Sequence, residues 1–523
     1  MMTPEDQSGT TPEDIRRKVE ERIAQEGAVA AGADGQTEIT SDFIHDCLRA
    51  NELGDGTLYA ATFRDKFLYC KNNQEWYEWA GHCWQRDVMN HSLASVEKIV
   101  EHYLSECKNI TGKLIEMASG PEPNPDEIKA IKSVQSNYLK RISQLRADKR
   151  RTACLKFAHT ISNPLAITGE EFDQHPMLFP CANGVIDLET GLINQGRPSD
   201  YLTLASPVSF TGIDTPAPIW ERSLLEIFGN NETLVAYLQR LIGYCMTGMV
   251  QEKVFPVLYG RTGWNGRSLI VETISHCMGK LAGPIPSEML LSQKFGKSAS
   301  GPSPDIMALK GLRLAFASEI DEGQKFSAAK IKWLTGRDEM VGRNPNDKYY
   351  THFDPTHKVM VMTNTQPSAP ANDKAFWERL HLIPFMISFV NRDPREDYER
   401  RAIIDLDRQV LQEESGILSW MVRGCLRWQK EGLNPPREIL EATEQYRRDE
   451  DLIGDFVDEC CIKEPAGKEK FSALYPRFVD WYHDNHGKKE PSGTWFGKQL
   501  SAKFTKNKSN GVVMYYGLTL SGD

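Results

Sequence analysis

The chain has 523 residues, enough for about three or four domains of ordinary size, and its 40% hydrophobic content can bury substantial cores. A formal net charge of −10 excludes a uniformly basic nucleic-acid coat, so any nucleic-acid contact must come from local basic patches. The eleven cysteines form no CxxC pair and no Cys/His group of zinc spacing, which favours buried thiols in a reducing compartment.

Residues 1–40 are polar and predict a loose N-terminal tail. The sequence shows neither a signal peptide nor an apolar run of membrane-spanning length. Both observations predict a cytoplasmic protein without membrane contact.

Residues 41–215 predict an N-terminal α+β domain. A helix is expected at 42–50, and the alternation at 67–69 and 75–79 predicts a hairpin. Four aromatic residues near the hairpin either form core, which is the commoner use, or stack on nucleic-acid bases: Trp76, Tyr77, Trp79 and Trp84.

The second half of this domain is mainly helical from 92 to 159. A basic run at 146–151 predicts a solvated helix face. Turn signals at Asn183 and Gly184, between apolar stretches, predict a small β-meander.

The most informative stretch lies between an apolar, strand-like run at 254–259 and a helix-like run at 269–274. Its glycines allow backbone N–H groups to surround phosphate oxygens, and the helix start adds its positive dipole end. The residues predicted to bind the phosphates of ATP are Gly260, Gly263, Asn265, Gly266, Arg267 and Ser268. Ser268 is also predicted to hold Mg²⁺. Arg267 stands where such loops usually have lysine, and a planar guanidinium need not fit the same slot.

Polar residues follow the next apolar strands. The strand at 312–318 ends at Glu319, with Asp321 close behind, where a nucleotide hydrolase keeps its water-orienting acid and metal-binding group. Glu319 is therefore predicted to orient water and bind the metal, and Asp321 to support the metal shell; the alternative is a strand capped by solvated acids. Asn364 ends a later strand and is predicted to sense the γ-phosphate. Arg379 is predicted to reach a neighbouring subunit's nucleotide as an arginine finger.

Strands and helices alternate between Val254 and Phe389, which predicts a parallel sheet flanked by helices. With the helices around it, this ATPase domain is placed at 216–430. The Gly- and Pro-rich stretch at 432–436 predicts a boundary, and residues 431–450 are expected to be a linker.

Residues 451–523 predict a winged-helix domain, with helices near 471–483 and 495–504 followed by paired strands at 511–520. Between Lys463 and Lys508 there are ten Lys or Arg against five Asp or Glu, a local charge of +5. This contrast with the acidic whole favours phosphate contact over simple solubility. The expected DNA contacts are Lys498, Lys503, Lys506 and Lys508.

The order of these motifs resembles helicase superfamily 3, and closely the satellite-phage and poxvirus type of primase-helicase. The matching stretches are residues 260–268, 311–322, 331–338, 364 and 377–385, and the likeness extends from about residue 41 to the end. The resemblance implies an AAA+-like P-loop ATPase core in a hexameric ring that pulls single-stranded or forked DNA through its centre. No primase metal triad is visible, so we expect the helicase part without the primase domain, with a separate primase or polymerase as a candidate partner. A phage-encoded chain would act in the bacterial host cytoplasm.

The resemblance also implies a pore hairpin. Residues 340–343 and 348–352 form two strand-like arms around the turn residues 344–347. Arg343 and Lys348 would face the DNA backbone from its tip, and Lys332 and Arg337 are further DNA-contact candidates. The alternative is an ordinary solvent-exposed hairpin.

Three functions remain open from the sequence. The first is an ATP-dependent replicative DNA helicase of a phage or mobile element. The second is a nucleotide-gated DNA-binding ring with weak or no hydrolysis, because Arg267 replaces the usual lysine. The third is a transcriptional regulator led by the winged helix, which leaves the order of the motifs unexplained.

Overall fold

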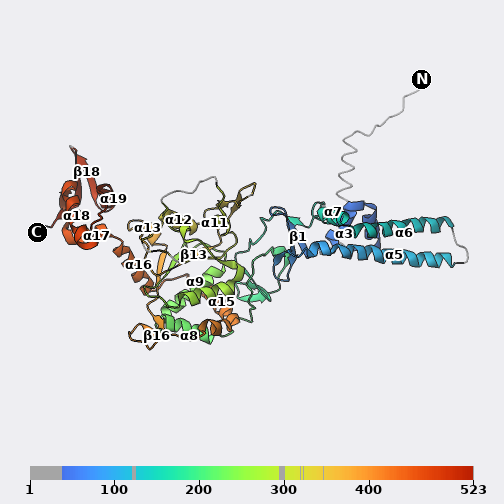
Figure 1. Ribbon diagram of the computed structural model, residues 1–523, viewed down its shortest axis with the longest axis horizontal. Helices are drawn as coiled ribbons and strands as arrows, with labels where there is room; N and C mark the ends of the chain where they lie inside the picture. Colours follow the sequence, from blue (N-terminus) through green and yellow to red (C-terminus); the bar gives the residue numbers. More distant parts are fainter. Residues whose placement is uncertain are drawn as a thin grey trace, which may run out of the picture. The chain divides into compact units, whose positions relative to one another are not determined.

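The computed structural model describes residues 38–120, 125–293, 301–318, 320–321, 323–345, 347–509 and 511–521 (Figure 1). The chain divides into two compact units. The first combines Met1–Gln174 with Gly196–Thr203, and the second combines His175–Gln195 with Leu204–Asp523. Among the described helices, none is long and apolar enough to cross a membrane.

The first unit joins helices to a four-stranded sheet of order β3-β2-β1-β4. Its strands are β1 (Phe67–Cys70), β2 (Glu75–Trp79), β3 (Trp84–Arg86) and β4 (Ala166–Ile167). Its helices are α2 (Ser41–Arg49), α3 (Asn51–Thr62), α4 (His91–Ala94), α5 (Val96–Ala118), α6 (Pro125–Leu145) and α7 (Asp148–Ala158), with a 3₁₀ turn at Pro198–Asp200. The long helices α5 and α6 lie side by side (Figure 1). The predicted helix at 42–50 and the predicted hairpin are confirmed, with Leu68 opposite Tyr77 in an antiparallel pair.

The aromatic cluster of the hairpin is used for packing. Trp84 is 2% exposed and meets Trp79 edge-on, with 5.4 Å between ring centroids. Trp76 is half-buried and packs against the core of the unit. These contacts favour the core interpretation of the cluster over base stacking.

A buried carboxylate ties the helices of the first unit together. Asp55 of α3 is fully buried and lies 2.6 Å from Arg141 of α6 and 2.8 Å from Arg150 of α7. The hydroxyl of Tyr103 donates to the same carboxylate at 2.9 Å. Because buried charges are tolerated only when paired and hydrogen-bonded, this network fixes α3, α5, α6 and α7 relative to one another.

The basic run at 146–151 is not a plain solvated face, as the sequence suggested. Arg150 belongs to the Asp55 network, and Arg146 donates to Glu97 at 2.7 Å. Arg151 donates to the carbonyls of Leu93 and Ala94, the last residues of α4. Three arginines of the run therefore hold neighbouring helices, a use that local sequence could not reveal because the partners lie about 50 or more residues away.

The second unit is built on a five-stranded parallel sheet of order β14-β8-β13-β10-β9. The strands are β8 (Phe255–Tyr259), β9 (Ala282–Pro284), β10 (Leu314–Ala317), β13 (Lys358–Thr363) and β14 (Leu380–Pro384). The predicted mixed α/β fold with a parallel sheet is confirmed.

Helices surround this sheet, and both of its faces are buried. The helices are α8 (Pro218–Ile227), α9 (Glu232–Met246), α10 (Arg267–Met278), α11 (Pro304–Met307), α12 (Ala328–Leu334), α13 (Lys374–Trp377), α14 (Leu406–Leu411), α15 (Glu414–Glu431) and α16 (Arg437–Asp449), with 3₁₀ turns at Gly279–Leu281 and Ser287–Met289. Leu258 and Met360 enter one hydrophobic core, and their neighbours Val257, Val359 and Val361 enter the other. Burial on both faces explains why these strands read as continuous apolar runs.

The predicted meander forms a small antiparallel sheet within the second unit. Its strands are β5 (Leu178–Cys181), β6 (Gly184–Asp187) and β7 (Leu192–Asn194). Arg313 donates to the carbonyl of Leu178 at 2.6 Å, which anchors the meander to the start of β10. Two further strand pairs are β11 (Met340–Gly342) with β12 (Thr351–Phe353) and β15 (Ser388–Val390) with β16 (Glu399–Arg401).

The segment expected as a linker, residues 431–450, contains α16. Tyr446 of this helix is 1% exposed and packs in the same core as Trp377, with 5.1 Å between ring centroids. The Pro-rich break at 432–436 thus separates two helices, α15 and α16, and the chain continues to pack against the sheet beyond it.

The C-terminal region carries helices and an antiparallel sheet of order β17-β19-β18. The elements are α17 (Leu452–Cys460), β17 (Cys461–Lys470), α18 (Phe471–His486), α19 (Gly493–Lys503), β18 (Thr505–Ser509) and β19 (Val512–Leu520). The two helices α18 and α19 lie where the sequence predicts them, but the stretch expected to hold paired strands, 511–520, is the single strand β19, which pairs with β18 and β17. Strand β17 was not predicted, because most of its residues are exposed and Pro465 and Gly467 interrupt its pattern.

All eleven cysteines are buried as free thiols, as their spacing predicts.

We expect Asp55→Ala to lower the free energy of unfolding of the first unit by about 3–5 kcal/mol, because it leaves two arginines without their buried counter-charge. Urea denaturation of the whole chain, followed by far-UV circular dichroism, measures the loss in the transition of this unit. The matched control is Glu97→Ala, which removes only an exposed pair and should cost less than about 1 kcal/mol. Equal losses in the two variants would contradict a structural role for the buried network.

Candidate nucleotide site

The candidate phosphate loop spans residues 260–266, between β8 and α10, as the sequence predicts. Trp264 and Gly266 adopt left-handed backbone angles, with φ of 60° and 84°. A Cβ atom at Gly266 would lie 2.6 Å from the side chain of Ile227, so only glycine fits there without a shift. At Gly260 a Cβ would meet the side chain of Asn265 at 2.0 Å.

Hydrogen bonds fix the loop and leave the start of α10 for a ligand. Asn265 Nδ2 donates to the Thr262 carbonyl at 2.8 Å, and the Phe389 amide donates to the Trp264 carbonyl at 2.7 Å. No side chain among the described residues caps α10. Because the first N–H groups of a helix lack intrahelical partners, this end favours an anion.

A pocket of about 540 Å³ opens beside the loop. This volume lies in the range of small-molecule and nucleotide sites. Its walls come from the end of α8, the loop with the start of α10, Asn364, and the region of β15 to α14. The lining residues are Ser223, Glu226, Ile227, 263–269, Asn364, Phe389, Asn391, Ala402, Ile403, Asp405, Leu406 and Asp407.

Sequence reasoning missed the walls at 223–227 and 389–407. These residues form no motif, and they lie about 35 residues before and more than 120 residues after the loop. Only the packing of α8 and the β15–β16 pair beside the loop makes them part of the pocket.

The parallel sheet brings several predicted site residues to one edge. Exposed Ser268 lies in the first turn of α10, Asn364 directly follows β13, and exposed Asp321 follows β10. The Gly260 amide donates to the Thr363 carbonyl at 3.3 Å, and Thr365 Oγ1 reaches the Ile320 carbonyl at 3.3 Å. Glu319, predicted to orient water and bind the metal, lies outside the described residues.

Arg267 is the exception within the loop motif, because its side chain turns toward the sheet. It is 8% exposed, and its guanidinium donates to the carbonyls of Leu258 and Thr363 and to the side-chain oxygens of Asn265 and Asn364. Burial lowers the pKa of this arginine from its usual value. The guanidinium therefore lies against the ends of β8 and β13.

Arg379 is not brought to the loop of its own chain. It lies directly before β14, where its carbonyl accepts from the amide of Phe255, the first residue of β8. The loop follows the opposite end of β8, roughly 16 Å away for five residues at about 3.3 Å each. Arg379 is half-buried, and its guanidinium approaches the Lys332 carbonyl at 3.5 Å.

The position expected for a pore hairpin holds the antiparallel pair β11–β12, with Val341 opposite His352. Tyr349 is 81% exposed in the connection between the strands, next to exposed Lys348. The half-buried Arg343 lies over the ring of Tyr350, 5.6 Å from its centroid. The connection thus combines positive charge with aromatic surface; Asn346, part of the expected turn, lies outside the described residues.

The remaining DNA-contact candidates differ in how far they are engaged. Lys332 pairs with Asp373 at 2.7 Å, and Lys503 pairs with Asp451 at 2.5 Å. The other candidates are exposed and form no ion pair with another described residue: Arg337 after α12, Lys498 on α19, and Lys506 and Lys508 on β18. These lysines are therefore better placed for phosphate contact than Lys332 and Lys503.

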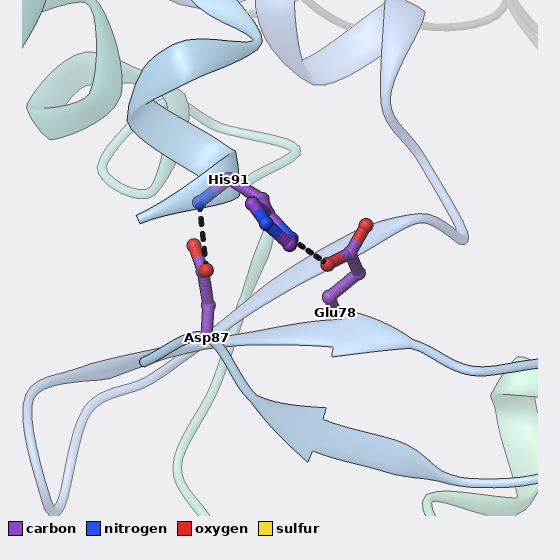
Figure 2. Close-up of side chains that lie close together, drawn as sticks. All are labelled: Glu78, Asp87 and His91. Carbon is purple, nitrogen blue, oxygen red and sulfur yellow. Dashed lines mark hydrogen bonds and ion pairs between the residues drawn. The ribbon is translucent and has the colours of Figure 1, made fainter. Parts of the chain in front are cut away.

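A separate cluster in the first unit joins Glu78, Asp87 and His91 (Figure 2). The two carboxylate oxygens of Asp87 accept the amides of His91 and Ser92 at 2.7 and 2.8 Å, which caps the start of α4. The His91 ring lies 2.7 Å from Glu78, and this hydrogen bond raises the pKa of His91. Both oxygens of the Asp87 carboxylate thus accept backbone amides. The cluster is therefore a cap at the start of α4 next to an ion pair of His91 and Glu78.

Comparison with known proteins links the chain to viral replication proteins. A family model described as "D5 N terminal like" matches residues 56–229. The chain is 24% identical over 473 residues to a provisionally named helicase, L207/L206, of Acanthamoeba polyphaga mimivirus, covering 87% of this chain and 48% of that protein. It is 24% identical over 484 residues to a provisionally named helicase, 184R, of Invertebrate iridescent virus 6, covering 83% and 49%.

Two further matches are more limited. A provisionally named primase, C962R, of African swine fever virus (isolate Warthog/Namibia/Wart80/1980) is 21% identical over 335 residues, covering 60% of this chain and 34% of that protein. The solved C-terminal region of NrS-1 is 11% identical, covers 60% of this chain and 77% of that structure, and has a TM-score of 0.35. The chain spans about half or less of the length of the curated relatives it matches. The predicted resemblance is confirmed: these matches support a relationship of the chain to phage and viral superfamily 3-type helicases.

We expect the pair of His91 and Glu78 to stabilise the first unit in acid and not in alkali. Because the pKa of His91 is raised in the folded chain, its contribution is complete below the unfolded value near 6.5 and is lost as pH rises through the folded value. Glu78→Gln should therefore lower the melting temperature more at pH 5.5 than at pH 8.5. Glu75→Gln, which removes a partner of the permanently charged Arg86, is the control and should show equal losses at both values. The same pH dependence in both variants would refute the role of His91.

Proposed function

We propose that this chain is the ATP-dependent motor of a replicative DNA helicase from a phage, virus or mobile element. The observation that carries the proposal is the convergence of the glycine-rich loop, Ser268, Asn364 and the end of β10 on one edge of a parallel sheet, beside a pocket of nucleotide size. In open α/β sheets, ligands bind outside the carboxyl ends of the strands, where the connections diverge. In this sheet β8 lies between β13 and β14, although β13 and β14 follow each other in the chain. The carboxyl end of β8, where the loop begins, is therefore such a position.

The residues present fit ATP and Mg²⁺. The N–H groups of the loop and of the first turn of α10 would bind phosphate oxygens, and Ser268 with Glu319 would hold Mg²⁺, which neutralises developing phosphate charge when bound. Glu319 would orient the attacking water, Asp321 would support the metal shell, and the amide of Asn364 would contact the γ-phosphate. Half-buried Phe389 on the pocket wall, beside the buried Ile227, offers apolar surface for the nucleobase.

The position of Arg379 supports a ring. Because it lies at the amino end of the sheet, roughly 16 Å from the loop of its own chain, it could act on a nucleotide only from a neighbouring copy. We therefore propose that the chain assembles as a homo-oligomer, of the hexameric kind expected for the family. Each nucleotide would lie where two copies meet.

DNA contact is proposed for two regions of the second unit. The β11–β12 hairpin carries Arg343 and Lys348, and would face single-stranded or forked DNA in the ring. The region from α17 to β19 places exposed lysines on helix α19 and strand β18, which supports a winged helix that contacts phosphates. The name of the C962R relative supports a functional link to priming, and a separate primase or polymerase is a candidate partner. The action would take place in the host cytoplasm.

One observation favours a second function. The guanidinium of Arg267 is engaged by the sheet, so the loop offers no described side-chain cation to the phosphates at the usual lysine position. Such a chain could bind ATP and close around DNA with slow hydrolysis or none. Turnover by the purified protein decides between the motor and the nucleotide-gated ring.

We expect the purified chain to hydrolyse ATP in the presence of Mg²⁺ and to do so faster with single-stranded DNA. Glu319→Gln should reduce turnover by at least about a hundredfold while ATP binding persists, because it removes the water-orienting carboxylate and leaves the loop intact. Glu272→Gln, at an exposed position on α10, is the matched control and should hydrolyse like the wild type. Wild-type binding without turnover would support the nucleotide-gated ring instead.

We expect Lys348→Gln in the hairpin to weaken binding of single-stranded DNA and to reduce the slope of log K against log salt concentration by about 0.7, the value for one lost phosphate contact. Fluorescence anisotropy with a labelled oligonucleotide at several salt concentrations measures both effects. Lys280→Gln removes an exposed charge outside the hairpin and should leave the slope unchanged. An unchanged slope in Lys348→Gln would show that the hairpin is an ordinary surface turn.

A further inference from the structure

The side chain of Arg267 contacts the ends of two strands and Asn364, the residue proposed to contact the γ-phosphate. Its Nη1 donates to the Leu258 carbonyl at 3.2 Å and also to the Thr363 carbonyl, on the adjacent strands β8 and β13. Its Nη2 donates to Asn364 Oδ1, and its Nε donates to Asn265 Oδ1 at 2.9 Å. One planar group therefore joins the phosphate loop, two strands and Asn364.

The four described acceptors are all neutral oxygens, and they match the fixed fork of a guanidinium. Arginine offers five N–H donors in one plane, whereas a lysine ammonium is a compact point charge with three. A lysine at this position could not reach Asn265, both carbonyls and Asn364 together. The contacts therefore depend on the residue being arginine.

The contact also sets the orientation of the Asn364 amide. A guanidinium has donors only, so the atom of Asn364 that faces it must be the oxygen. The amide N–H₂ group then lies on the other branch of the side chain, with two donors for the pocket that Asn364 lines. Without this contact the amide could turn by 180° and present its oxygen, which repels phosphate.

We propose that Arg267 is a positioning residue for ATP hydrolysis: it stays against the ends of β8 and β13 and orients Asn364 so that the Asn364 N–H₂ group donates to the γ-phosphate. The phosphates themselves are bound by the N–H groups of the loop and of α10. This inference rests on the proposed function, because it assigns Arg267 a role within that same nucleotide site. It replaces direct phosphate binding, which the sequence predicted for Arg267.

The test compares Arg267→Lys with the wild type in steady-state ATP hydrolysis with single-stranded DNA. Lysine is the usual residue of phosphate loops, so a phosphate-binding role predicts turnover equal to or above the wild type. The positioning role predicts that kcat falls about tenfold while KM changes less than about twofold, because Asn364 is misoriented and the loop still binds phosphate. Arg437→Lys makes the same change at an exposed position on α16, outside the site, and should have no effect.

Asn364→Ala provides a second variant at an exposed position that does not risk the fold. It should lower kcat to a similar extent, and the double variant Arg267→Lys with Asn364→Ala should be no slower than Asn364→Ala alone. Independent, multiplicative losses would mean that Arg267 does not act through Asn364. Thermal denaturation of each variant separates this outcome from loss of folding.

Two further results would overturn the inference. A structure with AMP-PNP and Mg²⁺ in which the guanidinium has moved from the Thr363 carbonyl to a phosphate oxygen would show direct phosphate binding by Arg267. The same structure tests the inference if the wild type binds nucleotide without turnover, when no kcat can be compared. If the wild type binds no nucleoside triphosphate, the proposed function fails and the inference fails with it. If the wild type hydrolyses ATP and Arg267→Lys is as fast, only the inference fails.

Discussion

The parallel pairing of β8, β13 and β10 is the constraint on which the candidate site depends. Parallel strands all point the same way, so the residues that follow them must gather at one edge. This rule brings the loop at 260–266, Asn364 and Asp321 together although about 100 residues of chain separate the first from the second. It also separates Arg379 from them, because that residue precedes a strand of the same sheet. The one sheet thus creates an edge for the candidate nucleotide site and an opposite edge that carries Arg379.

Buried arginine and lysine side chains donate hydrogen bonds to backbone carbonyls near both edges of this sheet. At the carboxyl edge, Arg267 binds strand-end carbonyls; at the amino edge, Arg313 donates to the Met246 carbonyl at 2.6 Å and Lys358 donates to the Thr356 carbonyl at 3.1 Å. Burial lowers the pKa of Lys358 to about 7. Buried carbonyl groups left without a partner would be costly, and these side chains satisfy carbonyls at the ends of β8 and β13, at the end of α9 and in the loop before β13. Arg267, the first residue of α10, therefore serves the packing of the sheet.

Charged residues of the two units have different structural settings. In the first unit, the interior arginines Arg141 and Arg150 are neutralised by Asp55 and connect helices. Arg150 belongs to the basic run at 146–151, so part of that run stabilises the fold. Lys498 of α19 and Lys506 and Lys508 of β18 have a different setting, because they are exposed and form no ion pair with another described residue. The net charge of −10 conceals this division, because it sums over both groups.

The sequence by itself determined the glycine-rich loop, the apolar strands with polar residues at their ends, the hairpins and the C-terminal helices, because each depends on local chemistry and period. The tertiary structure alone decided the walls of the pocket at 223–227 and 389–407, the helical packing of α16 and strand β17, since these depend on partners distant in the chain. It also decided the direction of one side chain. Arg267 looked like a phosphate ligand because its neighbours in sequence are glycines, but the acceptors that hold it come from β8 and β13, and only the folding of the sheet places them within its reach.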